Sequence, residues 1–297
     1  MTVSPDATVR RPRRQSHSGA YSAARWREEK HKGFNWAAPS FRPGWRWWYA
    51  LAALLVSHGV AYGINGALRL SGVRHFGLGG NLAVSVGVIE LDAFMLFAAW
   101  LFASRTCRPE PRHFGLRRPV GPRIGRAIAL SWFAGRTAAI IGALLTRGHV
   151  SNGRAHGTAA VALDVVLVVA VAPVVEEVFY RGFFYGSLRT RLPIAPAALV
   201  TGLVFGAVHL VGNGYPPGIA LGIGLNGAIW CLLFEYTGSL WPSILLHAYL
   251  NATATAAQYG PGLLLPALAG LVLAVIVLRR AAREPRQPAA MRPAASA

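Results

Sequence analysis

Charged residues are scarce in this chain, and acidic residues are the scarcest among them. Only 14% of the 297 residues are charged, with 11 Asp and Glu against 30 Lys and Arg, whereas 54% are hydrophobic. An ordinary soluble domain carries about 25% charged residues, so this composition excludes a typical soluble protein. Cysteine is also scarce, because Cys107 and Cys231 are the only two. Two such positions give neither a disulfide framework nor a cysteine metal site.

Long apolar runs take the place of the missing charge. Eight runs approach or exceed the ~20 apolar residues that cross a bilayer. We predict them to be membrane-spanning helices at about residues 47–68, 82–103, 124–145, 158–188, 194–211, 217–234, 240–257 and 262–278. The sequence therefore predicts an all-α fold, a polytopic membrane helix bundle with about eight transmembrane helices.

The net charge of +19 is concentrated at the flanks of these apolar runs. Arginine crowds into residues 1–44, 105–126 and the segment beyond 278. Basic flanks of this kind are typical of cytoplasmic loops and tails, where they lie near anionic lipid headgroups. The distribution argues against a nucleic-acid partner. It favours a multi-pass protein of the cell (plasma) membrane with both termini cytoplasmic.

Composition also predicts how the chain is divided. Residues 1–44 are polar, basic and rich in Pro and Ser, which indicates a disordered cytoplasmic tail and no cleavable signal peptide. Residues 45–157 form the N-terminal transmembrane helices, and residues 281–297 form a second disordered basic tail. Residues 158–280 contain the polar motifs described next and are the expected functional membrane domain.

Two glutamates and an arginine lie inside the fourth apolar run. An ionised side chain at the centre of a spanning helix costs roughly 2.5–3.5 kcal/mol on insertion scales, so its presence indicates a function. Glu177 and Arg181 are four residues apart on one helical face, which favours an ion pair. Glu176 points about 100° away and is left for chemistry, for example as a general base for water. The alternative is that both glutamates only tie helices together.

Two further spans carry paired polar or aromatic residues with helical spacing. Phe205 and His209 share a face of the fifth span, although a lone histidine on an apolar helix is more often a satisfied core residue. His247 and Asn251 share a face of the seventh span, where they can donate hydrogen bonds to a developing oxyanion. The alternative is interhelical hydrogen bonding, worth about 0.6 kcal/mol in membranes. Together with Glu176, the three motifs form a stronger constellation than any one of them.

The motifs Glu-Glu-x-x-x-Arg at 176–181, Phe-x-x-x-His at 205–209 and His-x-x-x-Asn at 247–251 resemble, in order, those of the CPBP intramembrane endopeptidases. That family includes type 2 CAAX prenyl proteases, bacteriocin-processing enzymes, the Abi proteins and lysostaphin resistance protein A-like proteins. The resemblance covers about residues 161–258 and departs from the family's pattern at no motif position. It implies that residues 158–280 are a CPBP-type catalytic membrane domain.

The resemblance also implies roles for individual residues. Glu176 would activate water with the assistance of His209, and His247 with Asn251 would stabilise the tetrahedral oxyanion. The other motif residues would support the site structurally: Glu177, Arg181 and Phe205. The family has been described both as glutamate-dependent and as metal-dependent. We favour metal-free activation; the alternative is a divalent metal such as zinc bound by Glu176, His209 and His247.

The expected function is thus an intramembrane endopeptidase that cleaves a membrane-associated protein or peptide, in CAAX-type or leader-peptide processing. Two alternatives use the same polar interior: a transporter that relays protons, and a non-catalytic immunity or partner protein. A proton relay does not require a histidine and an asparagine opposite a carboxylate, which favours the hydrolase.

One geometrical difficulty accompanies this prediction. The expected boundaries place Glu176 at mid-span, His209 near the outer end of its helix and His247 toward the inner side. At about 1.5 Å per residue these depths differ by many ångströms. Either the boundaries are wrong, or the fourth span bends near Pro173, or the fifth span is displaced inward.

Overall fold

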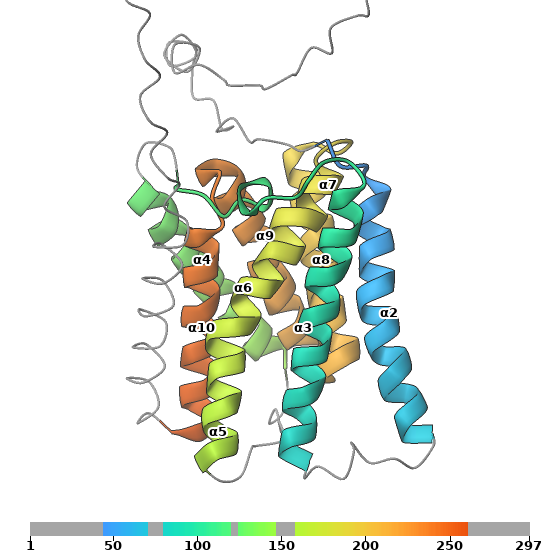
Figure 1. Ribbon diagram of the computed structural model, residues 1–297. Helices are drawn as coiled ribbons and strands as arrows, with labels where there is room; N and C mark the ends of the chain where they lie inside the picture. The colour runs from blue at the N-terminus through green and yellow to red at the C-terminus, as the bar shows by residue number, and fades with distance from the viewer. Residues whose placement is uncertain (1–43, 71–79, 120–123, 147–157, 261–297) are drawn as a thin grey trace, which may run out of the picture. The chain divides into compact units, whose positions relative to one another are not determined.

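The computed structural model describes residues 44–70, 80–119, 124–146 and 158–260. All of these residues belong to one compact unit, Ala37–Ala297. Every regular element in the described ranges is a helix, which confirms the all-α prediction for this part of the chain (Figure 1). The predicted eighth span and the predicted tails, apart from Gly44, lie outside the described residues.

Six described helices are long and apolar enough to cross a membrane. Five are regular: α2 (Trp48–Leu70), α3 (Gly80–Ser104), α4 (Ile124–Leu145), α8 (Ile194–Asn213) and α9 (Pro217–Thr237). The sixth is a composite span of residues 159–188. The predicted seventh span corresponds to α10 (Trp241–Tyr259), which is not among these six. By this criterion, the described residues account for six of the eight predicted spans.

The composite span changes its helical geometry along its length. It consists of α5 (Thr158–Val165), η3 (Val166–Val171), α6 (Ala172–Glu176), η4 (Glu177–Tyr185) and α7 (Gly186–Leu188). Both η3 and η4 are π-helical, with wider turns closed by i→i+5 hydrogen bonds. All nine residues of η4 are buried. A helix segment buried on every side lies in the interior of the bundle.

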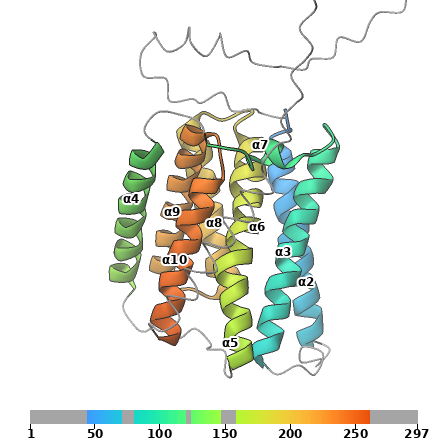
Figure 2. The ribbon, with the colours of Figure 1, turned by 60° about the vertical axis from the view of Figure 1, so that its left-hand side comes forward.

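The composite span lies between α3 and α10, as both ribbon views show (Figures 1 and 2). It packs against α2, α3, α8 and α10, and α2 also pairs with α3. Both α4 and α8 pack along α9. The segment that carries Glu176 and Glu177 is thus in contact with the helices that carry the other two motifs.

Glycine allows α8 and α9 to approach closely. A Cβ added at Gly206 would lie 2.5 Å from the carbonyl oxygen of Ala220, and one at Gly202 would lie 2.5 Å from that of Gly224. Such small residues are typical of helix interfaces in lipid, where no hydrophobic effect drives helices together. This contact fixes the distance between the helix of His209 and the helix of Trp230.

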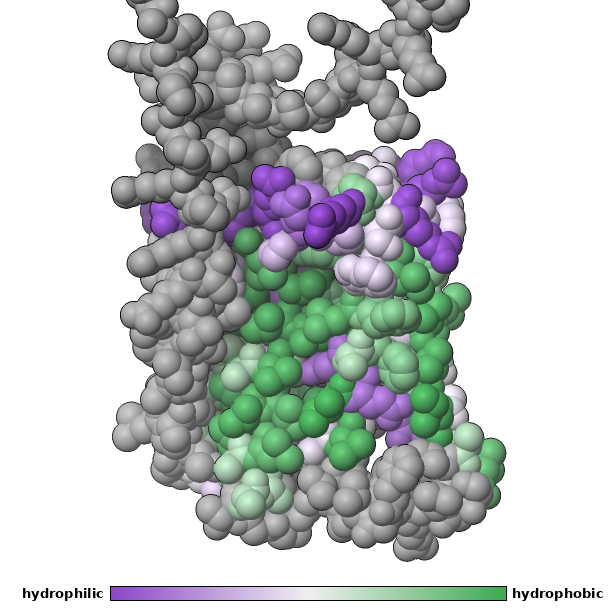
Figure 3. All heavy atoms as spheres, in the orientation of Figure 1, coloured by the Kyte–Doolittle hydropathy of each residue, from purple (hydrophilic) through white to green (hydrophobic). Residues whose placement is uncertain are grey.

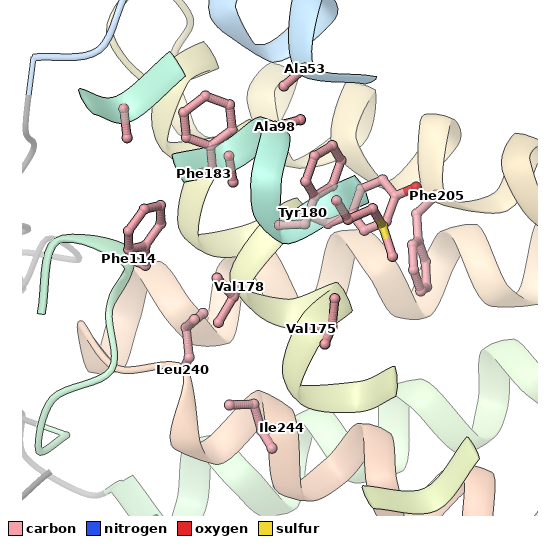
Figure 4. Close-up of a cluster of buried hydrophobic side chains, with 14 of the residues drawn as sticks. Ala53, Ala98, Phe114, Val175, Val178, Tyr180, Phe183, Phe205, Leu240 and Ile244 are labelled. Atoms are coloured by element: carbon pink, nitrogen blue, oxygen red, sulfur yellow. The ribbon is translucent and has the colours of Figure 1, made fainter. Parts of the chain in front are cut away.

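Aromatic side chains pack around η4 in the interior. Phe183, Tyr180 and Phe205 lie within one buried cluster with side chains of α2, α3 and α10 (Figure 4). A short 3₁₀ helix, η2 (Pro111–Phe114), places Phe114 against Trp45 with ring centroids 5.1 Å apart. The core therefore surrounds the segment that carries the first motif.

The outer surface is apolar along the helices and hydrophilic near the α7 end. Figure 3 shows hydrophilic residues gathered at that end above a broad apolar band. Large apolar side chains of α4 are exposed, among them Leu130, Phe133 and Leu144. A polar streak crosses the apolar band at mid-height, in the region of α3 and α6 (Figures 1 and 3). Polar groups therefore reach the surface within the apolar band.

Candidate active site

Glu177 and Arg181 form a fully buried ion pair within η4. Glu177 Oε1 lies 3.0 Å from Arg181 Nη1, and neither side chain has any exposed surface. The two residues are four positions apart, a spacing that favours an ion pair on a helix, and they form the pair within a π-helical segment. A buried charge at this depth requires a partner of opposite charge. Glu177 and Arg181 are such partners for each other.

Aromatic rings cover the guanidinium of Arg181. Its Cζ lies 4.2 Å from the centroid of Phe205 and 5.1 Å from that of Trp230. A planar guanidinium stacks on aromatic faces and is attracted by the ring quadrupole. Phe205 therefore links the second motif to the ion pair of the first.

His247 joins the two adjacent glutamates. Its Nδ1 lies 3.1 Å from Glu177 Oε1, and its Nε2 lies 3.6 Å from Glu176 Oε2. Two carboxylates that point in different directions from one helix thus face opposite nitrogens of one ring. Trp230 of α9 stacks on this ring, with centroids 4.5 Å apart and an interplanar angle of 29°. The third motif therefore meets the first one directly.

His209 is oriented by its own helix. Its Nδ1 lies 2.7 Å from the carbonyl oxygen of Phe205, four residues earlier. A carbonyl oxygen only accepts, so Nδ1 carries the proton, and in the neutral ring Nε2 is an acceptor. The Phe205 ring makes edge contacts with both histidines, with centroids 4.7 Å from His209 and 5.9 Å from His247. The structure therefore brings the second motif next to the other two.

Asn251 faces the composite span, where its Nδ2 donates to the carbonyl oxygen of Val168 at 2.8 Å. In η3 the amide of Ala172 donates to the carbonyl of Leu167, five residues earlier. In that register the next amide would bond to Val168, but residue 173 is proline and has no N–H. Asn251 thus satisfies a carbonyl that Pro173 leaves open. One N–H of the Asn251 amide remains for another acceptor.

The depth difficulty is not due to wrong boundaries. The described helices begin and end within about three residues of the predicted limits. Glu176 and His247 are nevertheless in contact. A uniform rise of about 1.5 Å per residue holds for an α-helix but not for a span with two π-helical stretches, so depths counted from residue numbers do not apply to this span.

The sequence interpretation missed four residues that contribute to the site. Trp230 stacks on His247, and Tyr180 hydrogen-bonds His58 of α2 with 2.9 Å between its hydroxyl oxygen and Nε2. Asp92 of α3 is buried and acts electrostatically on Glu176. A signal existed for Asp92 and His58, since both are polar residues within apolar runs. Nothing in the sequence distinguishes Trp230 from other core aromatics.

The described residues do not assemble a set of metal ligands. No three His, Cys, Asp or Glu side chains in the described ranges lie close enough together to hold an ion. His209 uses Nδ1 for the Phe205 carbonyl, and His247 uses Nδ1 for Glu177. Hydrogen bonds and ion pairs hold the polar cluster together.

Access to solvent differs between the two glutamates. The Glu176 side chain is 18% exposed, whereas Glu177 has no exposed surface and His247 is 6% exposed. Glu176 is thus the more accessible carboxylate of the pair, although its Oε2 atom is buried.

These features define a multi-pass membrane protein with a polar cluster inside its helix bundle, where carboxylates, histidines and an arginine meet. Residues 158–253 match the model of the type II CAAX prenyl endopeptidase family described as Rce1-like. This match agrees with the resemblance to the CPBP endopeptidases, and the matched family implies a CAAX-type membrane protease. The matched segment contains all three motifs. Comparison with curated proteins and with solved structures gave no match.

Proposed function

We propose that this protein is an intramembrane endopeptidase that hydrolyses a peptide bond in a membrane-associated protein or peptide by means of glutamate-activated water. The observation that carries the proposal is the imidazole of His247 between Glu176 and Glu177. This ring joins two motifs that are 70 residues apart in the chain, and it faces Glu176, the more accessible of the two carboxylates. The Rce1-like match supports CAAX-type processing as the first substrate class to test.

In the proposed reaction, Glu176 is the general base. Its carboxylate takes a proton from water while the water oxygen attacks the scissile carbonyl carbon. His209 accepts a hydrogen bond from the same water at Nε2, because Nδ1 is held by the Phe205 carbonyl. Glu176 then gives the proton to the leaving nitrogen as the C–N bond breaks. The products are a carboxylic acid and an amine.

The oxyanion of the tetrahedral intermediate is stabilised by His247 and Asn251. In its doubly protonated form, His247 donates Nδ1–H to Glu177 and Nε2–H to the oxyanion, with its positive charge balanced by the carboxylate behind it. The second N–H of the Asn251 amide is the further donor. Glu177, Arg181 and Phe205 support the site because they hold His247 in place.

The proposal also includes the setting of the reaction. The substrate lies in or at the bilayer. Anionic lipid headgroups contact the basic end of the bundle, where residues 105–119 contain several arginines. Water activation proceeds without a metal ion, so activity should survive exhaustive chelation and dialysis. Loss of activity on chelation, restored by zinc alone, would contradict the metal-free reaction and leave the protease proposal standing.

The test uses the purified full-length protein in phosphatidylcholine–phosphatidylglycerol vesicles. The probes are a farnesylated CAAX peptide with a fluorophore and quencher, and the same peptide without the lipid. We expect Glu176→Gln to lower kcat by about 10²–10⁴-fold and His247→Gln by about 10²–10³-fold. The matched control is Glu110→Gln, because Glu110 is an exposed carboxylate paired only with Arg112 among the ion pairs described.

Thermal unfolding must show that each variant is folded before its rate is interpreted. Cleavage by Glu176→Gln at the unmutated rate would contradict the assignment. If neither peptide is cut, the membrane peptides of cells that contain unmutated or Glu176→Gln protein are compared by mass spectrometry. Identical peptide sets would contradict a protease and favour a transporter or a non-catalytic partner.

A further inference from the structure

A chain of buried hydrogen bonds connects η4 to α2 beside the site. Tyr180 Oη lies 2.9 Å from His58 Nε2, and His58 Nδ1 lies 3.0 Å from Ser57 Oγ. All three residues are buried, with exposed fractions of 1%, 6% and 0%. The proposed reaction uses none of them. Polar groups at this depth are costly, so a connected set of three indicates a purpose.

The direction in which each hydrogen bond is donated follows from Ser57, the last residue of this series. Ser57 Oγ lies 2.8 Å from the carbonyl oxygen of Ala53, and that oxygen can only accept. Ser57 therefore donates its proton to Ala53 and accepts one from His58 Nδ1. In the neutral ring, His58 Nε2 then has no proton and accepts from the Tyr180 hydroxyl.

This direction determines what Tyr180 can offer to the site. A phenol has one proton, and here that proton is committed to His58. The Tyr180 oxygen therefore presents only lone pairs to any other neighbour. Without His58, the same hydroxyl would be free to donate a hydrogen bond.

The location of Tyr180 makes this acceptor relevant to Glu176. Tyr180 follows Glu176 by four residues on the same span and interacts with it electrostatically. Its ring makes an edge contact with Phe205, with centroids 4.9 Å apart (Figure 4). Phe205 is the ring that contacts both His209 and His247. The phenol thus borders the cluster on the side of α2.

We propose that Tyr180 is a further positioning residue of the active site, which His58 and Ser57 of α2 hold as a hydrogen-bond acceptor. The inference rests on the proposed function. Tyr180 acts through Glu176, because its oxygen accepts a hydrogen bond from the water that Glu176 activates or from the Glu176 carboxyl once it is protonated. In this way α2, which lies outside the Rce1-like segment, contributes to the site.

The kinetic test compares Tyr180→Phe, His58→Phe and the double variant in the vesicle assay. Both single changes keep an aromatic ring in the core. We expect each to lower kcat by at least about tenfold, with KM within twofold, since the orientation of the reacting water changes and substrate contacts do not. We expect the double variant to be no slower than Tyr180→Phe, because residues of one unit do not add.

The matched control is Tyr185→Phe. Tyr185 is equally buried in the same π-helical segment, but its hydroxyl donates to Glu235 Oε2 at 2.9 Å, away from the cluster. We expect its kcat to be unchanged. A loss of kcat in Tyr185→Phe equal to that in Tyr180→Phe would show a general packing effect and would overturn the proposal.

A spectroscopic test does not depend on activity. In ¹⁵N spectra of histidine-labelled protein, assigned with His58→Phe, we expect neutral His58 to carry its proton on Nδ1. A proton on Nε2 in the unmutated protein would overturn the inferred direction of the chain, whether or not the protein cleaves a peptide.

The outcomes separate this inference from the proposed function. If the unmutated protein cleaves peptide and Glu176→Gln does not, the proposed function stands. Under those conditions, a Tyr180→Phe variant with unmutated kcat, or losses that multiply in the double variant, would overturn the role of Tyr180 alone.

Discussion

Glu176 and Glu177 are neighbours in the chain, but their surroundings differ. Glu177 is enclosed and shares its Oε1 between Arg181 and Nδ1 of His247. Glu176 lies farther from the same histidine, at 3.6 Å, and its side chain is 18% exposed. The Glu177 carboxylate is thus fixed by an ion pair in the protein interior. The Glu176 carboxylate lies beside His247 and is only partly buried.

Removal of each carboxylate is predicted to have a different effect on stability. Glu177→Gln leaves the Arg181 guanidinium buried without its counter-ion, which we expect to cost about 3–5 kcal/mol. Glu176→Gln removes no short ion pair, so we expect a change in stability below about 1 kcal/mol. The measurement is thermal unfolding of both variants and the unmutated protein in one detergent. Equal losses of stability in the two variants would contradict the division of roles.

At the level of residues, the sequence predicts local pairs better than distant ones. The Glu177–Arg181 pair follows from spacing along one helix. The contact of His247 with both glutamates, the Trp230 stack and the Tyr180–His58 bond join helices far apart in the chain. Which face of one helix meets which face of another depends on packing, and a single sequence does not contain that information in readable form.

Element boundaries were predictable because apolar run length determines where a span begins and ends. The π-helical stretches were not. They depend on how the backbone of the composite span adapts to its neighbours, and Pro173 is the only residue that points to an irregularity there. Asn251 shows the consequence, because its bond to Val168 exists only in this irregular backbone.

The contact between η2 and η4 gives a prediction about one glycine. A Cβ at Gly182 would lie 2.5 Å from the carbonyl oxygen of Phe114, whereas one at Gly186 would meet only the Trp45 ring at 3.5 Å. Gly182→Ala must displace η2, so we expect a loss of about 1–3 kcal/mol of stability. The matched control Gly186→Ala should be neutral or stabilising by up to about 1 kcal/mol, because alanine favours a helix.

Thermal unfolding of the two glycine variants in the same detergent checks this prediction. Gly182→Ala should also cleave peptide more slowly, since η4 carries Glu177 and Arg181. If Gly182→Ala were as stable as Gly186→Ala, η2 would be able to move away from the added methyl group without a loss of stability.

The orientation of the whole molecule can be tested with its two native cysteines. The charge distribution predicts that residues 105–123 are cytoplasmic. Cys107 is partly exposed in that segment, whereas Cys231 is fully buried in α9. We expect a membrane-impermeant maleimide to label Cys107 in inside-out vesicles and not in intact cells. Cys231 should react only after denaturation, and labelling of Cys107 from outside would reverse the topology.

The same labelling should depend on pH. Burial, with a smaller contribution from Glu110, raises the pKa of the Cys107 thiol above its ordinary value. The thiolate is the reactive form, and a raised pKa reduces its fraction at neutral pH. The labelling rate should therefore keep increasing as the pH passes the ordinary thiol pKa of about 8.5. A rate that is already constant at pH 8.5 would contradict the raised pKa.

At the scale of the whole molecule, hydropathy identifies the membrane class and the Rce1-like match agrees with the motif resemblance. The total number of spans is a different matter. It also depends on α10 and on residues 262–278, of which the latter lie outside the described part of the chain. The predictions of eight spans and of cytoplasmic termini therefore require experiments. Cysteine labelling of the kind described for Cys107 tests on which side of the membrane a segment lies.

The π-helical stretches also change the angular phase of the composite span. An α-helix rotates by about 100° per residue, and each π turn takes up one residue more than an α turn. Side chains before η3 and after η4 are thus out of phase with a straight helix of the same sequence. Asp164 meets Tyr259 of α10, whereas Tyr185 meets Glu235 of α9. A helical wheel drawn through residues 158–188 would therefore assign its polar side chains to the wrong neighbours.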